Sequence, residues 1–303
     1  MRRRIKKTAV AVFFTAVTLT ILILLFVGEN SPFYLGNPLS DPKVTQLSQL
    51  SDDYIKFLDV GQGDAALISS NGKNAVIDTG PSSAGTALAS KLMNCDVKSM
   101  DVALITHFHD DHYGGLEYIT SAFSIKNLLI PDINKTEENT EEIRRISGAV
   151  ELSGGKVYTI VEGLNFNVGE FSVTVIGYYP ELSEENNRSV FAMAEMDGIR
   201  FLFTGDAEKE AEYQLIENTV DARCDVLKVG HHGSSSSSTK KFLEYVDPDY
   251  CVISVGLGNQ YSHPNDTVLA RFEEKKLKVY RTDLLGDITF NINEGDMQIL
   301  TNE

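Results

Sequence analysis

The chain is poor in cysteine and contains no tryptophan. Its 303 residues include three cysteines, Cys95, Cys224 and Cys251. Because they are odd in number, widely spaced and not arranged as CxxC, they predict neither a disulfide framework nor a cysteine zinc site. Cys224 and Cys251 lie in or next to apolar, strand-like runs, so we expect them to be small buried hydrophobic residues.

Positive charge is also scarce. The chain has 27 Lys and Arg against 43 Asp and Glu, for a net charge of −16. Five of the cations precede the first apolar run (Arg2, Arg3, Arg4, Lys6 and Lys7), so the rest of the chain carries about −21. Such an acidic domain repels polyanions and lacks the basic surface of a tight nucleic-acid binder. A nucleic-acid substrate would have to be held by metal ions or by a local basic patch.

The N-terminus predicts a membrane anchor. Residues 9–27 form a run of 19 residues without a charge, which as a helix nearly spans a hydrocarbon core of about 30 Å. The preceding basic cluster places the N-terminus in the cytoplasm and the rest of the chain outside. The run is longer than a signal-peptide core and no A-x-A site follows it, which favours an uncleaved anchor over a cleaved signal peptide.

The sequence therefore divides into three parts: a basic tip and transmembrane anchor (1–28), a polar tether (29–52) and a catalytic domain (53–303). From Tyr54 onward, runs of short strands alternate with helices, and Asn71-Gly72 between two apolar runs predicts a β-hairpin. This pattern favours a layered αββα sandwich over a doubly wound parallel sheet. The lipid bilayer is the one partner besides substrate that the sequence predicts.

The segment 106–115, THFHDDHYGG, holds the densest group of potential metal ligands. Three of the six histidines of the chain lie within it. On an extended segment residues i and i+2 point the same way, so His107 and His109 can bind one metal. The following turn brings Asp111 and His112 toward a second metal. Imidazoles and a carboxylate suit zinc, with manganese or iron as alternatives.

The other candidate ligands also follow predicted strands. His231 and His232 come after DVLKVG, His263 after YCVISVG, and Asp206 after IRFLFT. Asp206 in TGDAE is either the N-cap of the next helix or a carboxylate that bridges two metals. The serines 234–238 form either a flexible linker or part of the site.

These motifs resemble the metallo-β-lactamase superfamily. HxHxDH and TGD mark the superfamily, whereas FLDVGQGDAALI (57–68), LKVGHHGSSSSS (227–238) and YSHPND (261–266) are more specific and resemble the C-terminal domain of the ComEC family of competence proteins. The similarity extends from residue 54 to about residue 292. Unlike those proteins, this sequence shows one predicted membrane segment rather than a multi-helix channel.

The resemblance implies two divalent metal ions, with zinc expected and manganese as the alternative. His107 and His109 would bind one ion, Asp111 and His112 the other, and Asp206 would bridge them. Either His231 or His263 would complete the second site, and His232 with the nearby serines would face the substrate. Asp59, Asp64, Asp78 and Asn187 would orient ligands. Asn186 and Asn187 stand where the superfamily often has a further histidine ligand.

The resemblance favours an extracellular phosphodiesterase that uses a metal-bridging hydroxide as nucleophile. Its substrate would be DNA, with Lys228, Lys240 and Lys241 as a small anion site, or a cell-wall teichoic acid. For the latter, Tyr113, Tyr178, Tyr179 and Tyr261 could form a choline cage. The alternatives are a β-lactam or lactone hydrolase of the same fold and a non-catalytic competence-accessory module.

Overall fold

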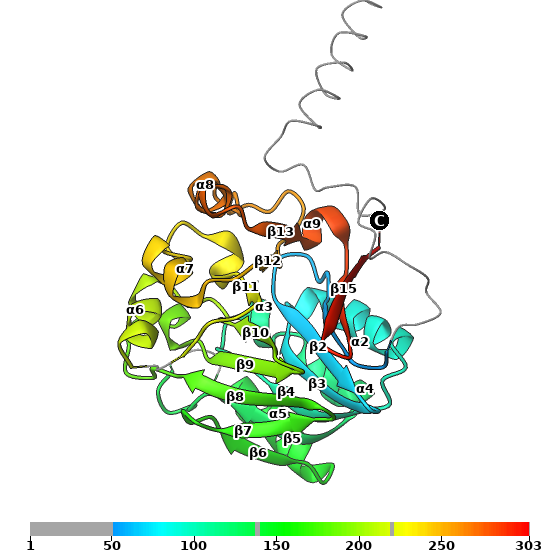
Figure 1. The fold of residues 1–303 in the computed structure, drawn as a ribbon. Coiled ribbons are helices and arrows are strands. Elements are labelled where there is room, and N and C mark those ends of the chain that lie inside the picture. The colour runs from blue at the N-terminus through cyan, green and yellow to red at the C-terminus, as the bar shows by residue number, and fades with distance from the viewer. Residues whose placement is uncertain (1–50, 137–139, 219–220, 303) are drawn as a thin grey trace, which may run out of the picture. The chain divides into compact units, whose positions relative to one another are not determined.

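A computed structural model describes residues 51–136, 140–218 and 221–302 (Figure 1). The predicted anchor at 9–27 lies outside these residues, so the structure does not test it. Across the described ranges, every helix is too short or too polar to cross a membrane.

The first sheet contains both chain ends of the described domain. Its strand order is β15-β14-β1-β2-β3-β4-β5-β6. The strands from β15 to β3 run antiparallel, and the strands from β3 to β6 run parallel. Their bounds are Tyr54–Phe57 (β1), Ala65–Ser70 (β2), Lys73–Thr79 (β3), Ser99–Leu104 (β4), Ser124–Ile130 (β5), Lys156–Thr159 (β6), Ile288–Asn293 (β14) and Asp296–Thr301 (β15).

The second sheet has the order β13-β12-β11-β10-β9-β8-β7. Strands β10 to β13 are parallel, whereas β7 to β10 form an antiparallel meander. Their bounds are Asn165–Val168 (β7), Phe171–Gly177 (β8), Phe191–Met196 (β9), Ile199–Phe203 (β10), Val226–Lys228 (β11), Tyr250–Ile253 (β12) and Lys278–Arg281 (β13).

Helices cover the outer face of each sheet. The apolar positions of α5, Ile143, Ile146 and Val150, recur at helical spacing and pack with α2 and α4 against the first sheet. On the second sheet α6, α7 and α8 do the same. The longer helices are Gly85–Asn94 (α2), Leu116–Ala122 (α4), Thr140–Leu152 (α5), Lys209–Asn218 (α6), Lys240–Val246 (α7) and Asp266–Lys275 (α8); the short ones are Ser82–Ala84 (η3), Asp110–Tyr113 (α3), Asn186–Arg188 (η4), Gly230–Gly233 (η5) and Thr282–Leu285 (α9).

Aromatic side chains join the inner faces of the two sheets. Phe57 of β1 lies 5.7 Å, ring centroid to centroid, from Phe203 of β10, and Phe201 lies 5.6 Å from Phe290 of β14 in an edge-to-face contact. Each fully buried phenylalanine contributes roughly 1.5–3 kcal/mol to folding. Helix, sheet, sheet and helix thus form the layered sandwich that the sequence predicted.

The β2–β3 hairpin also matches its prediction. Asn71 and Gly72 both have positive φ (50° and 71°), as a two-residue turn of this kind requires. The sequence pattern does not predict β13, because the short segment KVYR lacks an apolar run and is a strand only through its pairing with β12.

The parallel strands position the site. In the first sheet β3 and β4 run parallel, and in the second β10, β11 and β12 do. Asp78 lies at the end of β3, and the segments after β4, β10 and β11 carry His107, Asp206 and His232. Residues far apart in the sequence therefore meet at one edge of the sandwich.

Candidate metal centre

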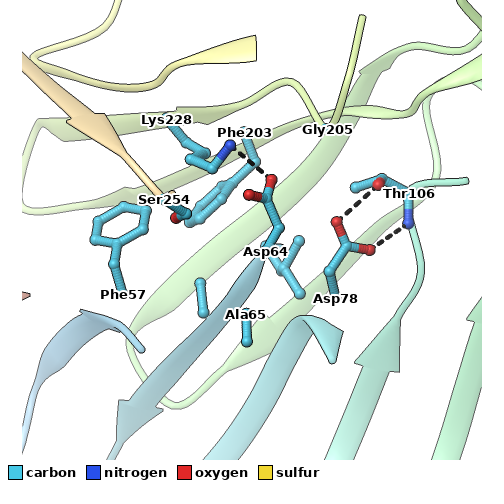
Figure 2. Close-up of a pocket in the computed structure, with 11 residues that line it drawn as sticks. Phe57, Asp64, Ala65, Asp78, Thr106, Phe203, Gly205, Lys228 and Ser254 are labelled. Carbon is cyan, nitrogen blue, oxygen red and sulfur yellow. Dashed lines mark hydrogen bonds and ion pairs between the residues drawn. The ribbon is translucent and has the colours of Figure 1, made fainter. Parts of the chain in front are cut away.

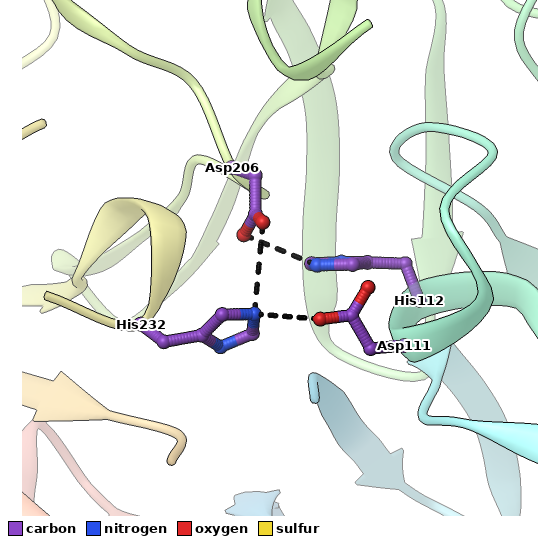
Figure 3. Close-up of side chains that lie close together, drawn as sticks. All are labelled: Asp111, His112, Asp206 and His232. Carbon is purple, nitrogen blue, oxygen red and sulfur yellow. Dashed lines mark hydrogen bonds and ion pairs between the residues drawn. The ribbon is translucent and has the colours of Figure 1, made fainter. Parts of the chain in front are cut away.

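Four side chains from three loops form the first ligand group. Asp111 and His112 come from the loop and short helix after β4, Asp206 from the loop after β10, and His232 from the loop after β11. Their ligand atoms all lie within 4.8 Å of one another. His232 Nε2 lies 3.1 Å from Asp111 Oδ2, and His112 Nε2 lies 3.1 Å from Asp206 Oδ1 (Figure 3).

The second group consists of His107, His109 and Asp206, again with ligand atoms within 4.8 Å of one another. His107 Nε2 faces His109 Nδ1 at 3.1 Å. Asp206 belongs to both groups, so its carboxylate lies where a residue bridging two cations would have to lie.

Buried polar atoms in the centre lack hydrogen bonds. His112 Nε2 and Asp206 Oδ1 are both buried, and neither makes a hydrogen bond even though the two atoms are 3.1 Å apart. A buried polar atom without a partner costs free energy. A divalent cation among these nitrogen and oxygen atoms would satisfy them, and the donor set of imidazoles and carboxylates suits zinc or manganese.

The electrostatics of the centre also favour a cation. Burial alone would raise the pKa of Asp206, but the neighbouring imidazoles of His112 and His232 hold it well below its usual range. Burial likewise opposes protonation of His232, yet Asp206 and Asp64 raise the pKa of this histidine to about 10. The ionised form of the buried carboxylates is therefore stabilised by nearby positive charge, which bound metal ions would supply in place of protons.

Asp78 orients His112. Its carboxylate accepts hydrogen bonds from the Thr106 backbone N–H (2.7 Å) and hydroxyl (2.7 Å) (Figure 2). Its Oδ2 also lies 2.8 Å from His112 Nδ1. His112 therefore directs its other ring nitrogen, Nε2, at the centre. A carboxylate behind a ligand histidine fixes the tautomer and orientation of the ring.

Asp64 and Lys228 form a buried ion pair behind His232. Lys228 Nζ lies 2.6 Å from Asp64 Oδ2 (Figure 2). It also donates to the Val229 carbonyl at 2.7 Å. Asp64 Oδ1 lies 3.3 Å from His232 Nδ1, which also contacts the Ser254 carbonyl at 2.9 Å. Burial raises the pKa of Asp64, but Lys228 and the histidines outweigh it, so the group remains ionised. Lys228 is therefore part of the interior rather than of an anion-binding surface.

Glycine is required where two loops of the centre touch. Gly63 has a φ of +147°, and a Cβ at this position would lie 2.5 Å from the Asp111 carbonyl oxygen. That close approach lets the Asp64 N–H donate to the same carbonyl at 2.9 Å. Gly63, the second glycine of DVGQGD, thus allows the loop that carries Asp64 to pack directly against the loop that carries Asp111.

The two adjacent histidines of the loop after β11 point in different directions. His231 and His232 both adopt left-handed backbone conformations, with φ of 49° and 52°. His232 points inward and is buried, whereas His231 Nδ1 lies 3.1 Å from Glu208 Oε1 and its Nε2 is 3.8 Å from Asp206 Oδ2. His263 lies farther out, its ring centroid 5.5 Å from that of His231.

This geometry differs from the expected roles. His232 was expected to face the substrate, and His231 or His263 to complete the second metal site. We propose instead that His232 is the ligand from this loop and that His231 and His263 line the approach, because His232 alone of the three joins the first ligand group among the described residues.

Sequence reasoning also missed Glu208. Its carboxylate accepts a hydrogen bond from the Ser236 hydroxyl at 2.9 Å, and Asn186 Nδ2 lies 3.4 Å away. These contacts fix the carboxylate that holds His231 in place. The feature of the sequence that could have identified Glu208 is its position two residues after Asp206. Asn187 does not touch a ligand: its side-chain oxygen accepts from the Glu208 and Ala211 N–H groups and caps the start of α6.

The serine segment is held in place rather than free to move as a linker. The buried carboxylate of Glu212 accepts from the Ser238 and Thr239 backbone N–H groups, and Arg271 donates to the Ser237 and Ser238 carbonyls at 2.9 Å. Burial raises the pKa of Glu212 to about 7. The remaining predicted residue, Asp59, accepts from the Gly61 N–H at 3.0 Å and shapes its own turn.

Comparison with known proteins identifies similar sequences. Residues 58–256 match the family model described as the metallo-beta-lactamase superfamily. ComE operon protein 3 of Bacillus subtilis is 28% identical over 79% of this chain and 33% of its own length, and Recombination protein 2 of Haemophilus influenzae is 29% identical over 81% and 29%. Endoribonuclease ysh-1 of Neurospora crassa is 24% identical over 58% of this chain and 23% of its own. The matches thus span a third or less of these relatives.

A solved structure shares the fold. The diiron β-hydroxylase CmlA from Streptomyces venezuelae superimposes with a TM-score of 0.54 at 14% identity, over 80% of this chain and 55% of that one. At this identity the similarity concerns the arrangement of layers and not the reaction.

Proposed function

The chain belongs to the metallo-β-lactamase superfamily, and from this premise we propose that it is a two-metal phosphodiesterase. One ion would be held by Asp111, His112, Asp206 and His232, the other by His107, His109 and Asp206. The observation that carries the proposal is the position of Asp206 in both ligand groups. When bound, two divalent cations activate water at neutral pH and clamp the oxygens of a phosphoryl group.

The residues of the chain supply orientation and charge. Asp78 and Asp64 keep Nε2 of His112 and of His232 directed into the centre. His231, held by Glu208, lies beside Asp206 on the more exposed side of the centre, where a substrate would enter. Burial of His107 lowers its pKa well below the usual range and keeps its ring neutral, as a ligand must be.

The substrate proposed is a nucleic acid. One similar protein is an endoribonuclease, and others are competence or recombination proteins. A teichoic-acid substrate with a choline cage finds less support. Tyr113 and Tyr178 are buried, and Tyr179 packs against Phe191 with ring centroids 6.2 Å apart. Of the four tyrosines considered for the cage, only Tyr261 is exposed.

The reaction class is tested with the purified full-length chain in detergent, stripped of metal and reloaded with zinc or manganese. We expect metal-dependent hydrolysis of bis(p-nitrophenyl) phosphate and no hydrolysis of nitrocefin. Cleavage of nitrocefin alone would move the proposal to β-lactam hydrolysis. Absence of activity on both substrates would favour a non-catalytic accessory module.

We also propose that residues 9–27 anchor the chain in the cytoplasmic membrane with the hydrolase domain outside. The support is the uncharged run behind a basic cluster. Alkaline phosphatase fused after Asn30 is expected to be active, because this reporter works outside the cytoplasm. A matched fusion of β-galactosidase at the same position should be inactive, and the reverse pattern would refute the topology.

A further inference from the structure

A row of aromatic rings leads from the metal centre to the surface. Ring centroids are 5.4 Å apart between His112 and His232, 6.2 Å between His232 and His231, 5.5 Å between His231 and His263, and 5.8 Å between His263 and Tyr261. Exposure rises along this row: His112 and His232 are buried, His231 and His263 are half-buried, and Tyr261 is 56% exposed. Successive ring contacts therefore connect the ligand groups to an exposed side chain.

Tyr261 is presented by a loop with a defined internal structure. The side chain of Asn259 accepts from the Tyr261 and His263 N–H groups at 3.1 and 3.0 Å, and it donates to the Gly256 and His263 carbonyls at 3.0 and 2.7 Å. The Tyr261 ring stacks on that of His263 with an angle of 27° between the planes. One face of the phenol ring is thus supported, while more than half of the residue is open to solvent.

The Tyr261 side chain takes no part in the hydrophobic core, because it is among the most exposed large apolar side chains of the described residues. A single flat ring backed by an imidazole lacks the several enclosing faces of a cage for a quaternary ammonium group. It does match the flat face of a nucleobase, which stacks on exposed aromatic side chains.

We propose that Tyr261 is the platform on which the base of an unpaired nucleotide stacks while a phosphodiester farther along the same strand lies in the metal centre. This inference rests on the proposed phosphodiesterase function and specifies its substrate as single-stranded nucleic acid. In a duplex the bases are already stacked on one another and paired. The acidic chain, at −16, also lacks the basic surface that a duplex backbone requires.

The test compares two single-stranded probes of equal length, ten-nucleotide oligo-dT and an oligomer of abasic residues, with the metal-loaded full-length chain. We expect kcat/KM to be about tenfold higher for oligo-dT, the order expected for loss of one stacked base. Tyr261→Ala should raise KM for oligo-dT about tenfold, leave kcat unchanged and leave the abasic probe unaffected. Tyr261→Phe should behave like the wild type, because the phenyl ring retains the stacking face.

Tyr158→Ala is the matched control, because Tyr158 is an exposed tyrosine on the edge strand β6 of the other sheet. This substitution should alter kcat/KM for neither probe. Equal cleavage of both probes by the wild type, or an unaltered preference in Tyr261→Ala, would overturn the stacking role and leave the phosphodiesterase intact. Cleavage of bis(p-nitrophenyl) phosphate without cleavage of either oligomer would overturn the nucleic-acid substrate. Inactivity on all three substrates would overturn the proposed function itself.

Discussion

Replacement of Asp206 by Ala is expected to lower kcat/KM for a phosphodiester by about a thousandfold or more. The carboxylate belongs to both ligand groups, so its loss would remove a ligand from each of two bound cations and would leave their mutual repulsion uncompensated. Metal content measured by atomic emission should fall from two ions per chain toward one or none. Steady-state hydrolysis of bis(p-nitrophenyl) phosphate provides the rate.

The fold should survive this substitution. The Asp206 N–H donates to the Ser189 hydroxyl at 3.0 Å, a contact that does not involve the carboxylate and keeps the loop in place. Circular dichroism of Asp206→Ala should therefore resemble that of the wild type. Asp59→Ala is a control acidic substitution outside the ligand groups and should retain both ions. An Asp206→Ala enzyme with two ions and full rate would rule out the bridging role.

Replacement of Lys228 by Met is expected to destabilise the domain by about 3–5 kcal/mol, the usual cost of removing one partner of a buried ion pair. Asp64 would keep a buried carboxylate without its closest counter-charge, 2.6 Å away in the native domain. Urea denaturation of the metal-free protein, monitored by tyrosine fluorescence, measures the loss. The metal-free state isolates the ion pair from the contribution of bound ions.

The double variant Lys228→Met with Asp64→Asn separates the charge from the shape of the side chains. Because it removes both charges, we expect it to recover a large part of the lost stability. It should nevertheless bind metal more weakly than the wild type, since a neutral amide in place of the Asp64 carboxylate would hold His232 Nδ1 less firmly. A single variant as stable as the wild type would show that the pair contributes nothing to stability. Lys240→Met, which breaks an exposed pair with Glu274, should leave the urea midpoint of unfolding unchanged, because solvent screens an exposed ion pair.

Local sequence patterns were sufficient for most of the fold. Helix α5 shows its apolar face at regular spacing, and Asn71-Gly72 marks the β2–β3 turn, because both elements depend on residues close in the chain. Strand β13 could not be recognised in this way, since its pairing partner β12 lies more than twenty residues earlier. The burial of Lys228 could not be predicted either, because a lysine in a strand is ordinarily exposed. Its burial is tolerated because Asp64, which precedes a strand of the other sheet, forms an ion pair with it.

By itself, the sequence predicted a metal centre and the position of its core. His107, His109, Asp111 and His112 fall within six residues, so chain geometry alone brings them together, and Asp206 is recognisable at the end of a strand. The tertiary structure decided which later histidine joins them. His231 and His232 are adjacent and identical in type, and they differ because the left-handed backbone turns one toward Asp111 and the other toward Glu208. That choice depends on contacts between loops from different strands, which no local pattern encodes.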